Sequence, residues 1–256
     1  SACVPASIAA PTLTPSPTPD TSTPDTSTLA PPTPDTPTLV PPTPDTSTSD
    51  ILTRAQKERL YQASLAYLAP TQEEAFAAVE KLNFVQYPSP SNMCGPLAIA
   101  ELRDAGLLSR YTDLHDFWQL RPDTNAQTIA RTFPSERFEH FRFHQSIGDF
   151  DFKTFPLKAG DFLYLYAGDR GTFEHILTVT RVDEQGRAYT VTNLNTQPYP
   201  NYYYVIKEVM LYDPNQPGVG EFYEWTDSKN NWIGMTGFGG FDVWRFSAPV
   251  QDVTSA

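Results

Sequence analysis

Cysteine and histidine are scarce in this chain of 256 residues, which contains two cysteines, Cys3 and Cys94, and four histidines. Two cysteines cannot build the dense disulfide framework of small secreted domains. The printed sequence has no apolar run long enough to span a bilayer, and its first residues lack the charged and hydrophobic regions of a signal peptide. It also lacks a glycine-rich phosphate loop and a serine-centred nucleophile turn. Nothing therefore indicates nucleotide binding or a serine hydrolase.

Residues 1–50 have no lysine, arginine or aromatic residue, but they hold 13 of the 25 prolines, 13 threonines and five aspartates. The sequence PPTPDT occurs in this segment at 31–36 and again at 41–46. Such a composition favours extended polyproline II and has too little apolar surface to offset the entropy of ordering. We expect residues 1–50 to be a disordered stalk.

The start Ser1-Ala2-Cys3, which leads directly into the stalk, resembles the end of a bacterial lipoprotein signal, where the cysteine receives the lipid. This resemblance implies a lipid anchor on Cys3 and an extracytoplasmic protein, either secreted or membrane-anchored. A plain start of the chain remains the alternative. A disulfide between Cys3 and Cys94 is disfavoured, because it would tie a disordered tail to the domain and silence the thiol.

Residues 51–248 are rich in Phe, Tyr and Leu and are numerous enough for one domain with a sizeable core. We expect a disordered tail over 249–256 and a monomer. The formal charge of −12 divides into −5 in the stalk and −7 in the rest of the chain. A net negative charge argues against a nucleic-acid partner, whose phosphates would be repelled.

Apolar residues at helical spacing predict a helix over 53–68, and a capping box at Thr71 predicts a second helix to about residue 82. Pro96 suits the first turn of a third helix, which Gly106 ends. Another capping box, at 124–127, predicts a short helix before Pro134. After Pro156 the pattern has period two, which predicts strands over 161–166, 175–182, 187–193, 203–212, 221–225 and 241–246. Helices followed by strands predict an α+β domain with an antiparallel sheet.

The spacing of Gln86, Cys94 and His175 is the most informative feature of the chain. Cys94 precedes a helix, where unpaired N–H groups and a nearby imidazolium would stabilise a thiolate. His175 begins a predicted strand, and the turn at 183–186 would return Asn193 to its level. Asn195 is the competing choice for the residue that orients the imidazole. These residues predict a cysteine nucleophile with a histidine base.

The segment 86–96, QYPSPSNMCGP, resembles the start of the C39-like branch of the papain-like cysteine peptidases, with a glutamine shortly before a Cys-Gly at a helix start. The segment 157–163, LKAGDFL, is similar to the Gly-Asp turn that precedes the histidine strand in the NlpC/P60 and CHAP amidases. The resemblance implies a papain-like fold, in which the nucleophile stands at the N-terminus of a helix packed on the sheet. The C39-like pattern usually has Asp as its third residue, whereas this chain offers Asn193 or Asn195.

The implied function is an amide hydrolase acting on peptides, proteins or cell-wall peptides through a thioester on Cys94, without a cofactor. His175 would protonate the leaving amine, Asn193 would orient its ring, and Gln86 with the Cys94 N–H would bind the oxyanion. Acyl transfer is a variant of the same chemistry. The alternative function is a surface-displayed binding module, without chemistry, for a glycan or protein partner.

Two other patterns are weaker. His140 and His144, with Glu136 and Glu139, would suit a metal if they lay on a helix, but the phenylalanines around them indicate a core edge, and we expect no metal site. The glycine- and aromatic-rich stretch 232–241 suits a lid or a carbohydrate-stacking rim, although a hairpin with core aromatics explains it as well.

Overall fold

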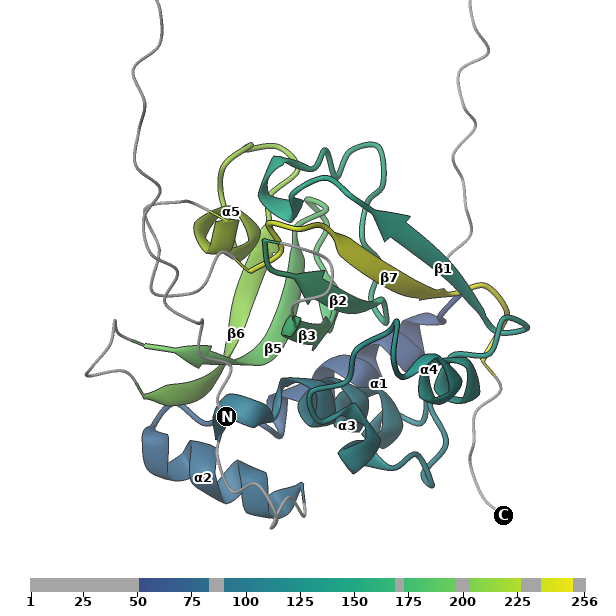
Figure 1. Ribbon diagram of the computed structural model, residues 1–256, viewed down its shortest axis with the longest axis vertical. Coiled ribbons are helices and arrows are strands. Elements are labelled where there is room, and N and C mark those ends of the chain that lie inside the picture. Colours follow the sequence, from purple (N-terminus) through teal and green to yellow (C-terminus); the bar gives the residue numbers. More distant parts are fainter. Residues whose placement is uncertain (1–50, 83–89, 169–172, 197–202, 227–235, 251–256) are drawn as a thin grey trace, which may run out of the picture. The chain divides into compact units, whose positions relative to one another are not determined.

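The computed structural model describes residues 51–82, 90–168, 173–196, 203–226 and 236–250 (Figure 1). The predicted stalk, Gln86 and residues 251–256 lie outside these ranges. In chain order the elements are α1 (Arg54–Leu65), α2 (Gln72–Lys81), the 3-10 helix η1 (Pro90–Asn92), α3 (Cys94–Asp104), the 3-10 helix η2 (Leu114–Phe117), α4 (Ala126–Thr132), β1 (Phe138–Phe143), the 3-10 helix η3 (Ile147–Asp149), β2 (Phe162–Tyr166), β3 (Phe173–Thr178), β4 (Arg181–Val182), β5 (Ala188–Asn195), β6 (Tyr204–Tyr212), α5 (Glu221–Thr226) and β7 (Phe241–Phe246). The α+β class and the antiparallel pairing predicted from the sequence are confirmed.

The first two helices begin at capping boxes, of which the one at Thr71 was predicted from the sequence. Thr53 accepts from the backbone N–H of Gln56 while the Gln56 side chain accepts from the N–H of Thr53. Thr71 and Glu74 make the same reciprocal pair at the start of α2. Each box satisfies two backbone donors that a helix start otherwise leaves unpaired.

The strands form a four-stranded sheet in the order β1-β7-β2-β3 and a three-stranded sheet in the order β4-β5-β6, with antiparallel pairing throughout. The last strand, β7, lies between β1 and β2 in this order (Figure 1). The neighbours of β7 in the sheet are therefore strands about 75–105 residues earlier in the chain. A local sequence pattern could not predict this insertion.

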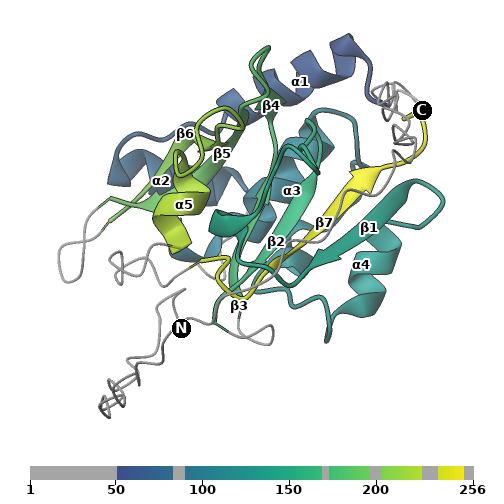
Figure 2. The same ribbon diagram turned by 90° about the horizontal axis from the view of Figure 1, so that it is seen from above.

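The four-stranded sheet is covered on both sides, and we call these sides the α3 face and the α5 face. Alternate residues of β2 divide between two hydrophobic clusters: Phe162, Tyr164 and Tyr166 pack with α3, while Leu163 and Leu165 pack with Phe222 and Trp225 of α5. In Figure 1 the sheet lies between these two helices, and Figure 2 shows α1 running beside α3. A strand buried on both faces reads as a continuous apolar run, as FLYLY does.

Helix α3 packs closely against strand β3. A Cβ at Gly95 would collide with the carbonyl of Phe117 and lie 3.2 Å from Cδ1 of Ile176. One turn further along, Thr178 donates a hydrogen bond to the carbonyl of Ala98 at 2.9 Å. Glycine after Cys94 is thus a steric requirement for the close approach of the start of α3 to the Phe117 carbonyl of η2.

Two sequence-based expectations about secondary structure were wrong: the capping box at 124–127 and the strand over 221–225. Helix α4 begins at Ala126 after Asn125, which makes no side-chain capping bond. Residues 221–225, predicted as a strand, form helix α5. Phe222 and Trp225 are three positions apart, so on this short helix they lie on the same side, and both are buried. Residues 138–143, which would have to be helical for a metal site at His140 and His144, form strand β1. Phe138 packs into the core there, and β1 pairs along its whole length with β7, so pairing with a distant strand decides the conformation.

The packed chain extends slightly beyond the expected boundary at residue 248. Val250 is buried, and its carbonyl accepts a 2.8 Å hydrogen bond from the Gln56 side chain. The domain therefore includes at least residues 249 and 250. Among the helices of the described ranges, none combines the length and apolarity needed to cross a bilayer.

Candidate active site

Cys94 is the first residue of α3, and its side chain is 1% exposed within the cluster on the α3 face. The preceding residue, Met93, makes no side-chain capping bond to the helix. The N-terminus of a helix attracts negative charge, because the dipoles of its peptide groups point their positive ends there. This position suits a thiolate or an oxyanion.

Asn193 lies on the same face of the protein as Cys94. Val191, two residues earlier on β5, belongs to the α3-face cluster, and the Asn193 side chain donates a 2.7 Å hydrogen bond to the carbonyl of Pro90, just before α3. Asn193 is 4% exposed, and its Oδ1 has no hydrogen-bond partner among the described residues. Oδ1 of Asn195, the competing candidate, is likewise buried without a partner there. Both candidates thus present an unused acceptor on the face that carries the thiol.

His175 lies on the other face. It lies opposite Leu165 of β2 in the β2–β3 ladder, and its ring contacts Trp225 edge-on with centroids 5.4 Å apart. Leu165 and Trp225 both belong to the α5-face cluster. Its Nε2 lies 3.0 Å from the hydroxyl of Thr192, the residue before Asn193. Its neighbour Ile176 is the residue that packs on the start of α3. The structure thus brings the backbone of His175 close to the cysteine, while the imidazole points away from it.

An irregularity in the β2–β3 ladder occurs at this histidine. Leu165 is opposite His175 and Tyr166 is opposite Phe173, so Glu174 is an extra residue with no partner in the register. A bulge of this kind changes the side of the sheet to which the neighbouring side chains point. The face that His175 occupies therefore depends on where this one extra residue lies.

The remaining sequence-predicted residues are distributed as follows. Gln86 and Cys3 lie outside the described residues. The Gly-Asp turn of segment 157–163 is structural: Asp161 is buried, accepts from the backbone N–H of Lys158 and pairs with Arg245 of β7 through two bonds of 2.9 and 2.6 Å. The turn thereby joins the start of β2 to the last strand.

Sequence reasoning missed a buried polar cluster centred on Asp242. This carboxylate is 0% exposed and accepts hydrogen bonds from Nε and Nη2 of Arg142, from Nε2 of His140 at 3.2 Å and from the Tyr166 hydroxyl at 3.0 Å. Burial alone would raise the pKa of Asp242, but these bonds and the charge of Arg142 outweigh burial and lower the pKa to about 2. The only signal in the sequence was an aspartate in the apolar strand FDVWRF.

Glu101 of α3 is a second buried carboxyl group, in a contrasting environment. It is 0% exposed, and neither of its oxygens has a hydrogen-bond partner among the described residues. Desolvation raises the pKa of Glu101 well above its usual value, which favours the protonated, uncharged form.

Within the described residues, no group of three or more His, Cys, Asp or Glu side chains is arranged to hold a metal ion. No protein-family model, curated protein or solved structure matches this chain.

Proposed function

We propose that this protein is a papain-like cysteine hydrolase of the C39-like kind, which cleaves amide bonds in peptides, proteins or cell-wall peptides. The observation that carries the proposal is the unused acceptor of Asn193. A buried amide oxygen without a donor costs free energy, on the order of 1–3 kcal/mol, and an imidazole N–H beside Cys94 would satisfy it.

The reaction would proceed by roles that the residues of the chain supply. The Cys94 sulfur would attack the carbonyl carbon, His175 would pass the proton to the leaving amine, and water would then hydrolyse the thioester. Asn193 would accept from the second ring nitrogen of His175 and hold the ring in place. The backbone N–H groups at the start of α3, with Gln86, would bind the developing oxyanion.

This mechanism requires His175 to turn from the α5 face to the α3 face. The bulge at Glu174 makes that turn a local change, because moving the extra residue by one position reverses the side to which His175 points. His175 would exchange its contact with the Thr192 hydroxyl for one with the adjacent Asn193. The hydrogen bond lost on one face is thus replaced by one on the other.

We further propose that the protein acts outside the cytoplasm, secreted or held at a membrane by a lipid on Cys3, with residues 4–50 as a spacer. This proposal rests on the lipoprotein-like start and the composition of the stalk.

One observation favours the second candidate function, a binding module without chemistry. The imidazole of His175 contacts Thr192 and Trp225, and the thiol of Cys94 is buried. If this arrangement is the working state of the protein, Cys94 is a small core residue and His175 a satisfied strand histidine.

The test is the pH dependence of Cys94 alkylation by iodoacetamide in the full-length chain carrying Cys3→Ser, so that Cys94 is the single thiol. We expect alkylation to persist well below the free-cysteine pKa of about 8.5. His175→Ala and Asn193→Ala should both move the profile toward that value, whereas His140→Ala, a matched change of a histidine on another strand, should leave it in place. A His175→Ala profile that coincides with that of the parent protein, or a thiol that does not react at all, would favour the binding module.

A further inference from the structure

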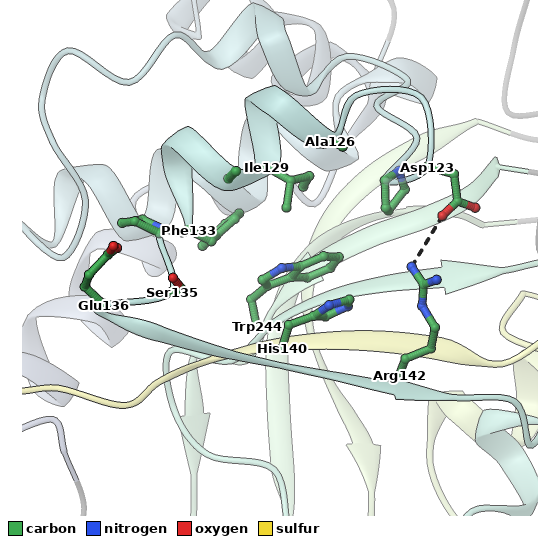
Figure 3. A pocket seen from close by; sticks show the side chains of 12 residues that line it. Asp123, Ala126, Ile129, Phe133, Ser135, Glu136, His140, Arg142 and Trp244 are labelled. Carbon is green, nitrogen blue, oxygen red and sulfur yellow. Dashed lines mark hydrogen bonds and ion pairs between the residues drawn. The ribbon is translucent and has the colours of Figure 1, made fainter.

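A cavity of about 730 Å³ lies between helix α4 and the strands β1 and β7. Figure 3 shows its arrangement: Ile129 and Phe133 point from the helix toward the sheet, while His140 and Arg142 rise from β1 toward the helix. Trp244 lies between helix α4 and His140 and stacks on the imidazole ring, with ring centroids 4.4 Å apart and an angle of 5° between the planes. The volume falls in the range of about 300–1,000 Å³ that is typical of small-ligand sites.

The polar groups of the cavity are held by the buried carboxylate of Asp242. Arg142 uses Nε and Nη2 for Asp242, and the other bond of Nη2 is a long one, 3.4 Å, to Asp123 at the cavity rim. Among the described residues Nη1 has no partner, and the Arg142 side chain is 40% exposed. One end of the guanidinium group is therefore fixed while the other offers two N–H donors to the cavity.

Asp242 also determines which nitrogen of His140 carries the hydrogen. A carboxylate can only accept, so the 3.2 Å contact places the hydrogen on Nε2 and leaves Nδ1 of the neutral ring as an acceptor. Among the described residues Nδ1 has no partner, and the His140 side chain is 39% exposed. The cavity thus presents fixed donors and a fixed acceptor two residues apart on one strand.

The charges around the cavity disfavour an anion. Arg142 balances Asp242, which leaves Asp123 and Glu136 at the rim to repel a negative group. Ile129, Phe133 and Trp244 form an apolar wall of the cavity. The ligand that fits carries no negative charge, is partly apolar, and has a hydrogen-bond donor beside an acceptor.

We propose that this cavity binds an uncharged peptide segment, in which the backbone carbonyl and the N–H of one extended residue bond to Arg142 Nη1 and His140 Nδ1, respectively, and an apolar side chain packs against Phe133 and Ile129. The site is separate from Cys94 and does not depend on the chemistry proposed above. The cost of burying an ionised carboxylate is consistent with this role, because Asp242 orients both polar groups that line the cavity.

The test is NMR titration of the full-length Cys94→Ala protein, labelled in its histidine rings, with the neutral dipeptide N-acetyl-Leu-Leu-amide. We expect saturable shifts of the His140 ring nitrogens. At least tenfold weaker binding is expected of the same dipeptide with a free C-terminal carboxylate, because Asp123 and Glu136 at the rim would repel it.

Variants connect the shifts to the cavity. His140→Phe preserves stacking on Trp244 but removes the acceptor, Arg142→Met removes the donors, and each should weaken binding at least tenfold, with folding checked by thermal melts. His115→Phe is the matched control, since His115 contacts Trp118 at a different site. The proposal is overturned by the absence of saturable binding, by binding that survives both cavity variants, or by tighter binding of the carboxylate form.

Discussion

Asp242 and Glu101 are two buried carboxyl groups, both 0% exposed, with opposite surroundings. Asp242 accepts bonds from three side chains, and its pKa falls to about 2, whereas Glu101 has no partner among the described residues and its pKa is raised. Desolvation is the largest influence on the pKa of both groups and acts in the same direction. Between these two groups, the donors around the carboxylate therefore make the difference.

At Asp242 the cost of burying a charge is offset by hydrogen bonds, and these bonds also orient groups around a cavity. At Glu101 the cost of burying a polar group is offset by no hydrogen bond among the described residues. Stability measurements should therefore respond in opposite directions at the two positions.

The largest effect is expected from Asp242→Ala. Removing the carboxylate leaves Arg142, His140 and Tyr166 without their shared acceptor, so the free energy of unfolding should fall by about 3 kcal/mol. Urea denaturation at pH 7 measures this change. A loss below about 1 kcal/mol, which is the level of an exposed ion pair, would show that the cluster contributes little.

A second test uses the acid limb of the wild-type protein. Because the pKa of Asp242 is lowered in the folded state, its stabilisation is complete above the unfolded value near 4 and disappears as the pH falls toward 2. The loss should be about 2 kcal/mol, given roughly 1.4 kcal/mol per unit of pKa difference. Asp242→Asn should flatten this limb, and an unchanged pH dependence in that variant would contradict the assignment.

Glu101→Met is expected to act in the opposite direction. Replacing an unsatisfied buried carboxyl group by an apolar side chain of similar length should raise the free energy of unfolding at pH 7 by about 1–3 kcal/mol. Because the folded-state pKa of Glu101 is raised, the wild-type protein loses stability from this group as the pH rises above 4.5. The advantage of the variant should therefore shrink at pH 4. An advantage that stays constant from pH 4 to pH 7 would mean that Glu101 does not titrate in this way.

The smallest effect tests the contact between His175 and Thr192. Thr192→Val removes one hydrogen bond, worth about 1 kcal/mol, and should raise the rate of Cys94 alkylation at pH 7 about fivefold if that contact holds the imidazole away from the thiol. Thr190→Val is the control. Thr190 lies on the same strand as Thr192, and its hydroxyl bonds to the carbonyl of Thr178 on β3 instead of to His175. Equal rates in the two variants would show that Thr192 does not restrain His175.

Part of the candidate site was readable from local signals. The Cys94 helix start, the capping box at Thr71 and the α+β class follow from residue patterns within a few positions of each other, and the structure has them. Asn193 was named from the length of a hairpin, and β5 does return it to the neighbourhood of α3. The face to which His175 points was beyond such reasoning, because it depends on one extra residue in a ladder with a different strand.

The sequence by itself determined what its local chemistry controls: a proline- and threonine-rich segment that lacks the apolar surface to pack, helices that begin at Thr53 and Thr71, and a thiol at the start of α3. Only the tertiary structure decided which polar groups are buried together. β7 enters the sheet between β1 and β2, and this insertion places Asp242 beside His140, Arg142 and Tyr166. The physical reason is that hydrogen-bonded partners of a buried charge are supplied by strands far apart in the chain, and their register is fixed by packing on both faces of the sheet.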